Sequence, residues 1–176
     1  FFIVACCAMC ATAAKVVWQI GVADNSGTEL ALGPSEYKKF LAHDFGYEDR
    51  YFLVGTSVDK NDFPYVLPGP DDTWGGTWST SGWRTHDANI LFGIKKLPKH
   101  GKWKLVVDLV DANPSRSVVK VMVNSAEKKF EIKGHSKGVL EGNLQDAKEQ
   151  ILEFPISAND LKKGGNMVTV SVLEGG

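Results

Sequence analysis

The sequence predicts an all-β fold, an antiparallel β-sandwich of about eight strands with one or two short helical turns. Three observations lead to this fold class. Apolar residues alternate mostly with period two, Gly, Pro and Asn stand between the alternating segments, and helical patterns are scarce. The sequence contains no internal repeat, low-complexity tract or linker, so we expect about 160 residues to form one domain with its own core.

Eight segments carry the strand pattern. In one of them every second residue from Trp103 to Leu109 is apolar, which places these side chains on one face of a half-buried strand. In the last segment every second residue from Val168 to Val172 is apolar, with Thr and Ser between. The eight segments are residues 16–20, 50–55, 88–94, 102–112, 116–123, 128–132, 150–156 and 166–173.

Helical signals are confined to two places. Residues 34–43 predict a helix of about two turns beginning at Ser35, directly after a proline. Residues 157–166 predict a single capped turn, with Ser157 as the cap and Asp160 three residues later. Residues 111–116 contain Asn and Pro and predict a tight connection between two strands.

The first 14 residues are uncharged and largely apolar, and as a helix they are too short to span a bilayer. We interpret residues 1–13 as a signal peptide without its Met and basic start, since residues 11–13 match the A-x-A cleavage pattern. A second interpretation makes Cys6 a lipoprotein acylation site. Either one predicts an exported protein, periplasmic, extracellular or at the cell surface. The domain is then residues 14–176, and we expect it to be cut short at its C-terminus.

Composition excludes several classes of function. All three cysteines, Cys6, Cys7 and Cys10, fall within residues 1–13, so the rest of the chain contains no disulfide and no Cys-based metal site. With 20 basic and 21 acidic residues, charge gives no reason to expect nucleic acid or a membrane surface as partner. The sequence contains no G-x-x-x-x-G-K or H-E-x-x-H motif. We therefore predict no catalytic residue and no metal ligand here, which leaves open whether the parent protein is an enzyme.

Residues 71–87 are rich in Gly, Ser and Thr, and ten consecutive positions of this segment contain three of the chain's five tryptophans. A sugar site needs an aromatic platform and a few fixed polar groups. A loop longer than about 12 residues is usually functional or disordered. The candidate carbohydrate-binding residues are Trp74, Trp78, Trp83, Asp72, Arg84 and His86. The alternative is that the tryptophans seal one end of the sandwich.

Two polar clusters have a structural and a functional interpretation. Oxygen ligands for a structural calcium ion are available at Asp24, Asn25, Thr28 and Glu29, but a turn with an Asx-type hydrogen bond is the interpretation that we favour. We therefore expect no cofactor, with calcium as the alternative. Carboxylates next to a histidine can perform acid–base chemistry, yet the adjacent positions indicate a solvated connection. This second cluster comprises His43, Asp44, Glu48, Asp49 and Arg50.

Several stretches resemble a known family. They are "VWQIG" (17–21), "YFLVGTSVDKNDFPYV" (51–66), "ANILFGIKKLPKHGKWKLVVDLVDA" (88–112), "VVKVMVNS" (118–125) and "LEFPISANDLKKGGNMVTVSVLE" (152–174). They look like the carbohydrate-binding-like jelly roll, of the galactose-binding-like kind, that forms the third domain of rhamnogalacturonan lyases of polysaccharide lyase family 4. The resemblance covers nearly the whole chain after residue 13.

The resemblance implies an ancillary carbohydrate-binding or supporting module of an exported polysaccharide-degrading protein. Its partners would be a plant-type, pectic rhamnogalacturonan-like glycan and a neighbouring catalytic domain, with no transmembrane segment. In the family the lyase chemistry sits in a separate domain that precedes the jelly roll, so the parent could be a lyase, a glycoside hydrolase or non-catalytic. One alternative is that the chain is part of a polysaccharide lyase and contributes Arg84 and His86 to its substrate cleft. Another is a purely structural spacer.

Overall fold

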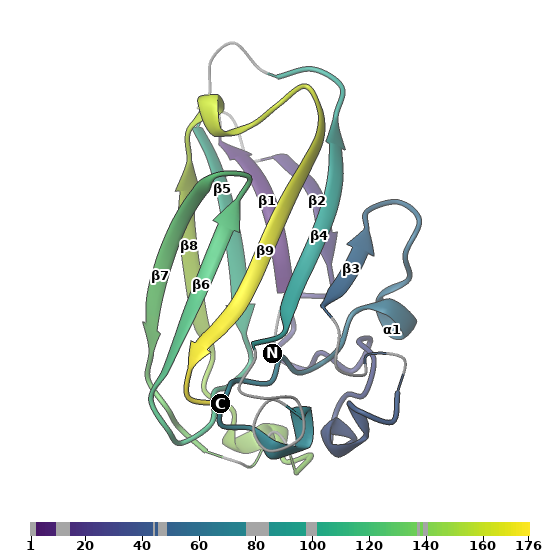
Figure 1. The fold of residues 1–176 in the computed structure, drawn as a ribbon, viewed down its shortest axis with the longest axis vertical. Helices are drawn as coiled ribbons and strands as arrows, with labels where there is room; N and C mark the ends of the chain where they lie inside the picture. The colour runs from purple at the N-terminus through teal and green to yellow at the C-terminus, as the bar shows by residue number, and fades with distance from the viewer. Residues whose placement is uncertain are drawn as a thin grey trace.

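The computed structural model describes residues 3–9 (backbone only), 15–43, 45, 49–76, 85–97, 102–136, 138 and 141–176. Within these residues two β-sheets face each other as a sandwich (Figure 1). The strands are β1 (Ile3–Met9), β2 (Lys15–Ile20), β3 (Arg50–Leu53), β4 (Asp87–Ile94), β5 (Lys102–Leu109), β6 (Ser117–Val123), β7 (Ala126–Ile132), β8 (Gln150–Ile156) and β9 (Gly164–Glu174). The predicted all-β sandwich is confirmed, and the eight predicted segments correspond to β2 through β9.

The five-stranded sheet has the order β3-β4-β9-β6-β7. The last strand, β9, inserts between β4 and β6 and pairs antiparallel with both, so the end of the chain is hydrogen-bonded to residues that precede it by 45 to 84 positions. The pair β3–β4 at one edge is parallel, which the predicted antiparallel pattern did not include. The connection between β3 and β4, residues 54–86, is far longer than a hairpin turn, and a long connection permits parallel pairing.

The four-stranded sheet has the order β2-β1-β5-β8, with every pair antiparallel. Residues 1–13 are predicted to lie outside the fold, but the structure pairs Ile3–Met9 with β2 on one side and β5 on the other. The physical reason is that this extended segment satisfies backbone N–H and C=O groups that the facing edges of β2 and β5 would otherwise leave unpaired. Cleavage of the segment as a signal peptide stays a prediction.

The core lies between the two sheets and follows the predicted alternation. The inward side chains of β5, from Trp103 to Leu109, are buried, as are those of β9 from Val168 to Val172. Trp18 of β2 meets Phe92 of β4 across the core, with ring centroids 5.2 Å apart. A packed apolar interior of this kind is what holds a sandwich without disulfide bonds.

The helical elements are single turns. They are η1 (Tyr37–Lys39), α1 (Asp59–Asp62), η2 (Thr73–Gly75), η3 (Leu144–Asp146) and η4 (Ala158–Asp160). The capped turn predicted at Ser157 is present as η4, with a capping box between Ser157 and Asp160. The two-turn helix predicted from Ser35 shrinks to η1, because Ser35 has a left-handed φ of 70° and Phe40 turns into the core.

Candidate functional site

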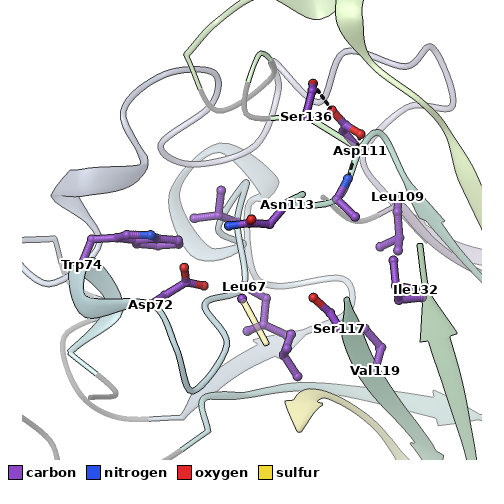
Figure 2. A pocket seen from close by; sticks show the side chains of 14 residues that line it. Leu67, Asp72, Trp74, Leu109, Asp111, Asn113, Ser117, Val119, Ile132 and Ser136 are labelled. Carbon is purple, nitrogen blue, oxygen red and sulfur yellow. Dashed lines mark hydrogen bonds between the residues drawn. The ribbon is translucent and has the colours of Figure 1, made fainter. Parts of the chain in front are cut away.

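A hollow opens between the sheets at the end of the sandwich where β5, β7 and β9 end and β6 begins (Figure 2). We call it the loop-end cavity. Its apolar lining comes from strand ends and the segment after α1: Val66, Leu67, Leu109, Val119, Ile132 and Val172. Its polar lining comes mostly from loops: Asp72, Asp111, Asn113, Ser117 and Ser136, with the ring of Trp74 on one side. The cavity therefore has an apolar floor made by the sandwich and a polar rim made by its loops.

Asp111 is a firmly placed polar group of the rim. Its side chain is only 4% exposed. Oδ1 accepts a hydrogen bond from the backbone N–H of Ala112 (2.9 Å), and Oδ2 accepts one from the hydroxyl of Ser136 (3.1 Å), as Figure 2 shows. Nδ1 of His135 lies 3.2 Å from Oδ1. These contacts fix the direction in which the carboxylate faces the cavity.

Close packing between two loops holds Asp111 in place. Backbone N–H of His135 donates to the carbonyl of Ala112 (3.1 Å), which joins the segment after β7 to the β5–β6 loop. Gly134 makes this approach possible, because a Cβ at this position would lie 2.1 Å from the carbonyl oxygen of Pro114. Within the β5–β6 loop, Asn113 accepts a hydrogen bond from the N–H of Ser115 (3.2 Å), an Asx turn.

Asp72 and Trp74 form the opposite side of the rim, and both are predicted site residues. Oδ2 of Asp72 accepts a hydrogen bond from the N–H of Gly69 (2.8 Å) in a buried position. Trp74 lies in η2 and is partly buried. Its ring meets those of Tyr37 and Phe40 edge-on, at centroid distances of 5.1 and 6.1 Å. The structure thus brings Asp72 and Trp74 to one cavity, with the indole held by aromatic neighbours.

His86 is placed differently from the prediction. It is fully buried, its Nε2 lies 2.7 Å from the carbonyl oxygen of Gly75, and its ring packs on Phe40 at a centroid distance of 5.2 Å. A side chain with no exposed surface does not meet a glycan in this conformation. His86 instead anchors the turn that carries Trp74. The predicted residues Trp78, Trp83 and Arg84 lie outside the described residues.

Asp111, Asn113 and Ser136 are rim residues that the sequence analysis does not assign to a site. Asp111 and Asn113 belong to the connection predicted at residues 111–116, and an Asx–Pro turn directly after a buried strand is the signal that could have drawn attention to them. Ser136 lies 25 residues after Asp111, at the centre of residues 134–138, whose sequence GHSKG has the G-x-S-x-G spacing. Only the pairing of the two loops brings it to Asp111.

Tyr65 lies directly before the lining residue Val66, and its pKa is affected by burial and by the charge of Asp111. Its side chain is fully buried in the core. Burial, and after it the negative charge of Asp111, raises the pKa of the Tyr65 phenol well above its usual range. The Tyr65 phenol is therefore neutral in the folded protein.

The turn predicted as a possible calcium site is closed by its own hydrogen bonds. Oδ1 of Asp24 accepts from both the N–H (3.0 Å) and the hydroxyl (2.8 Å) of Ser26, and Glu29 accepts from the N–H of Val22 (2.6 Å). This is the Asx-type turn that we favoured. Within the described residues no group of three or more His, Cys, Asp or Glu side chains is placed to hold a metal ion.

The cluster at residues 43–50 packs around an aromatic ring where it is described. His43 stacks on Phe45 at a centroid distance of 4.4 Å, and the guanidinium of Arg50 lies 4.5 Å from the centroid of the same ring. Asp49 accepts a hydrogen bond from the N–H of Asp87 (3.1 Å), which ties this connection to the start of β4. Asp44 and Glu48 lie outside the described residues.

A second hollow lies on the outer face of the five-stranded sheet, near the start of β9. We call it the sheet-face groove, and its lining is Leu53, Leu91, Phe92, Gly93, Asn124, Gly165, Asn166 and Met167. Gly93 and Gly165 pair across β4 and β9, and a Cβ on either would meet no atom within 4 Å. The groove is therefore floored by bare backbone.

The loop-end cavity has the features that sugar binding requires. Its apolar floor can take the C–H face of a sugar ring, Trp74 offers an aromatic surface, and the Asp111 carboxylate can accept hydrogen bonds from hydroxyls. The sheet-face groove has the apolar surface without a charged group in its lining. The two hollows are thus suited to different partners.

Comparison with known families agrees with the fold. The family model described as "CBM-like: Polysaccharide lyase family 4, domain III" matches residues 16–175. A search of curated proteins finds no match to the chain. In the described part of the chain, no helix has the length and apolar character that crossing a membrane would require.

Proposed function

Because the chain belongs to the CBM-like domain III family of polysaccharide lyase family 4, we propose that it is a carbohydrate-binding module and that the loop-end cavity is its binding site. One observation carries this proposal. Trp74 and Asp111 stand on the rim of a single cavity with an apolar floor, and each is held in place by the fold rather than by a ligand. Such preorganisation lowers the entropy lost on binding.

The glycan that we propose is a pectic polysaccharide of the rhamnogalacturonan type, bound on behalf of a neighbouring catalytic domain in an exported protein. A cavity with one aromatic ring contacts only a short part of such a polymer. We therefore expect weak affinity for the isolated chain, raised in the parent protein by linkage to other domains. The family match supports a glycan ligand, and the choice of pectin follows from the sequence resemblance.

A second candidate function is a spacer that docks a neighbouring domain. The observation in its favour is the exposed apolar surface of the five-stranded sheet. Tyr51 is 61% exposed, Leu53 47% and Met167 38%, and the last two line the sheet-face groove. Clusters of exposed apolar side chains commonly mark contact surfaces.

Affinity electrophoresis against rhamnogalacturonan, homogalacturonan, galactan and xylan tests the first proposal. We expect retardation by a pectic polymer, and we expect Trp74→Ala to weaken binding at least about fivefold, if a sugar ring on the indole loses roughly the 1–3 kcal/mol that a stacked base loses when its aromatic platform is removed. Trp74→Phe keeps an aromatic ring in η2 and guards against loss of the turn itself. Met167→Ala, in the sheet-face groove, is the matched control and should bind as the unchanged protein does.

Two results would contradict the proposal. One is that no polymer retards the protein while circular dichroism shows the sandwich intact. The other is that Met167→Ala weakens retardation and Trp74→Ala does not, which would move the binding surface to the sheet. The first result would favour the spacer, and the second would keep glycan binding but assign it to the sheet-face groove.

A further inference from the structure

The described lining of the loop-end cavity carries a buried carboxylate, Asp111, whose side chain is 4% exposed. Its ionic neighbour among the described residues is His135, whose Nδ1 lies 3.2 Å from Oδ1 and whose imidazole is charged only when protonated. A buried carboxylate is screened by solvent far less than a surface one, so a ligand carboxylate in the cavity would meet its negative charge.

We propose that the loop-end cavity selects an uncharged, hydroxyl-bearing sugar unit and rejects a uronate, so that in an acidic pectic chain it reads the neutral sugars. This inference rests on the proposed function and deepens it. A uronate carboxylate in the cavity would lie near the like charge of Asp111 and would lose its own hydration there. A neutral ring of the same size suffers neither penalty.

The acceptors on the rim fit the hydroxyl groups of a sugar. A carboxylate only accepts hydrogen bonds, and each of its oxygens can take about two. Oδ2 of Asp111 accepts one from the hydroxyl of Ser136 among the described residues, which leaves room for a sugar O–H as a second donor. A ligand that brings donors is therefore favoured over one that brings another carboxylate.

The floor adds a preference for a sugar with an apolar edge. Leu109, Val119 and Ile132 are buried side chains at the ends of three strands, and they face the cavity without a polar atom among them. A hydroxymethyl or carboxyl group set against this floor would lose hydrogen bonds with water. A methyl group, as in a 6-deoxyhexose, or the C–H face of a hexose would not.

A pair of matched probes isolates charge from shape. The methyl glycoside of galacturonic acid and the methyl ester of that glycoside differ only at the carboxyl group, which is charged in the first and neutral in the second. Methyl rhamnoside supplies the deoxy sugar. Binding of each to the protein is followed by ¹⁵N–¹H chemical shifts at about pH 8, above the ordinary titration range of histidine. A chelator is present throughout, so that no divalent cation bridges acid to acid.

We expect the rhamnoside and the ester to bind, and the free acid to bind at least about tenfold more weakly than the ester. Asp111→Asn removes one charge while keeping the shape of the side chain and an acceptor for the N–H of Ala112. This variant should bring the affinity for the free acid closer to the affinity for the ester. Asp49→Asn, whose side chain lies outside the lining and accepts a backbone hydrogen bond in the same way, should leave the ratio unchanged.

The inference fails if the free acid binds as tightly as the ester or more tightly, or if Asp111→Asn leaves the ratio unchanged in a folded protein. In both cases the proposed function stands, because a glycan still binds. If neither the three probes nor the polymers bind, the proposed function falls and this inference falls with it. The comparison of acid with ester uses the unchanged protein, so it remains decisive even where Asp111→Asn does not fold.

Discussion

The loop-end cavity and the sheet-face groove lie at opposite ends of β9, and they differ in what their polar groups are doing. The cavity is lined by Val172 near the end of the strand, and the groove by Gly165 and Met167 near its start. Both offer apolar surface. In the cavity, Asp111 is held by a backbone N–H and a serine hydroxyl and still has acceptor capacity.

In the groove the polar side chains are committed to the protein itself. The amide of Asn124 donates to the carbonyl of Asp160 (2.6 Å) and to Oδ1 of Asn166 (2.9 Å), while its own oxygen accepts from the N–H of Met167 (3.1 Å). Asn166 in turn bonds both the N–H and the carbonyl of Lys162. These amides brace the β6–β7 turn against the start of β9. They stabilise the fold and have little capacity left for a ligand.

The difference shows that apolar surface alone does not make a carbohydrate site. Hydroxyls need partners that the fold has fixed in place and has not used up. The cavity meets this condition because two loops cross at its rim, whereas the groove lies on a regular sheet. The first two predictions below change residues at the loop-end cavity and use the same kind of substitution in the sheet-face groove as the control.

The largest effect is expected from Phe40→Ala, behind the rim of the cavity. Phe40 is fully buried and contacts the rings of Phe45, Trp74 and His86. Its removal leaves a hole that these neighbours cannot fill, so the free energy of unfolding should fall by about 3–5 kcal/mol. Urea denaturation measures it. The control is Leu53→Ala in the groove, where the side chain is 47% exposed, and its loss of unfolding free energy should be about 0.5 kcal/mol or less. An equal loss of stability in both variants would contradict this expectation.

Two glycines compare the hollows by the same substitution. In Gly134→Ala the new Cβ would meet the carbonyl oxygen of Pro114 at 2.1 Å, so the loops that hold Asp111 must separate. We expect a loss of about 1–3 kcal/mol of stability together with weaker glycan retardation. Gly93→Ala meets nothing within 4 Å and should preserve both. Thermal unfolding and affinity electrophoresis on the two variants check this, and a harmless Gly134→Ala would show that the loop contact is not needed.

His86→Leu tests the buried anchor of the Trp74 turn. The variant keeps an apolar side chain in the core and removes the partner of the Gly75 carbonyl, so we expect a loss of about 1–3 kcal/mol. The fluorescence of the protein should also change if the environment of Trp74 loosens. Full stability with unchanged glycan binding would argue that Trp74 is held by Tyr37 and Phe40 alone.

The smallest effect concerns Asp108, a buried carboxylate outside both hollows. Burial, and then the nearby Glu149, raises the pKa of Asp108 above its ordinary value of 3.8. A raised pKa means that the charged form is disfavoured in the folded state, so the cost appears as pH rises through the ordinary value and is complete above the raised one. Asp108→Asn should therefore be slightly more stable than the unchanged protein at neutral pH. The two should converge below about pH 4, and a gap that widens on acidification would contradict this.

The strands could be predicted from the sequence because their signal is local. Alternation within β5 or β9 is visible in eight or eleven residues, and the core confirms it. The strand at Ile3–Met9 could not be predicted in this way, since an uncharged apolar run fits a signal peptide as well as a strand. Its pairing partner β5 begins only at Lys102, far along the chain, and cleavage of the run as a signal peptide stays a prediction.

The candidate site could be predicted only in part. Trp74 and Asp72 carry an aromatic and polar pattern that can be seen in one short segment. His86 lies in the same segment, yet its burial depends on Phe40, which comes from another loop. Asp111 and Ser136 become neighbours only because Gly134 lets two loops meet, a contact that no local pattern contains.

The most direct test of the loop-end cavity as a glycan site is a ¹⁵N–¹H titration with a rhamnogalacturonan oligosaccharide. The account predicts shifts of the Trp74 indole N–H and of the backbone amides of Asp111, Ala112 and Asn113, while the amides of Gly93 and Gly165 stay in place. Shifts confined to Gly93, Gly165 and Met167, with Trp74 and Asp111 unmoved, would contradict it and assign binding to the sheet face.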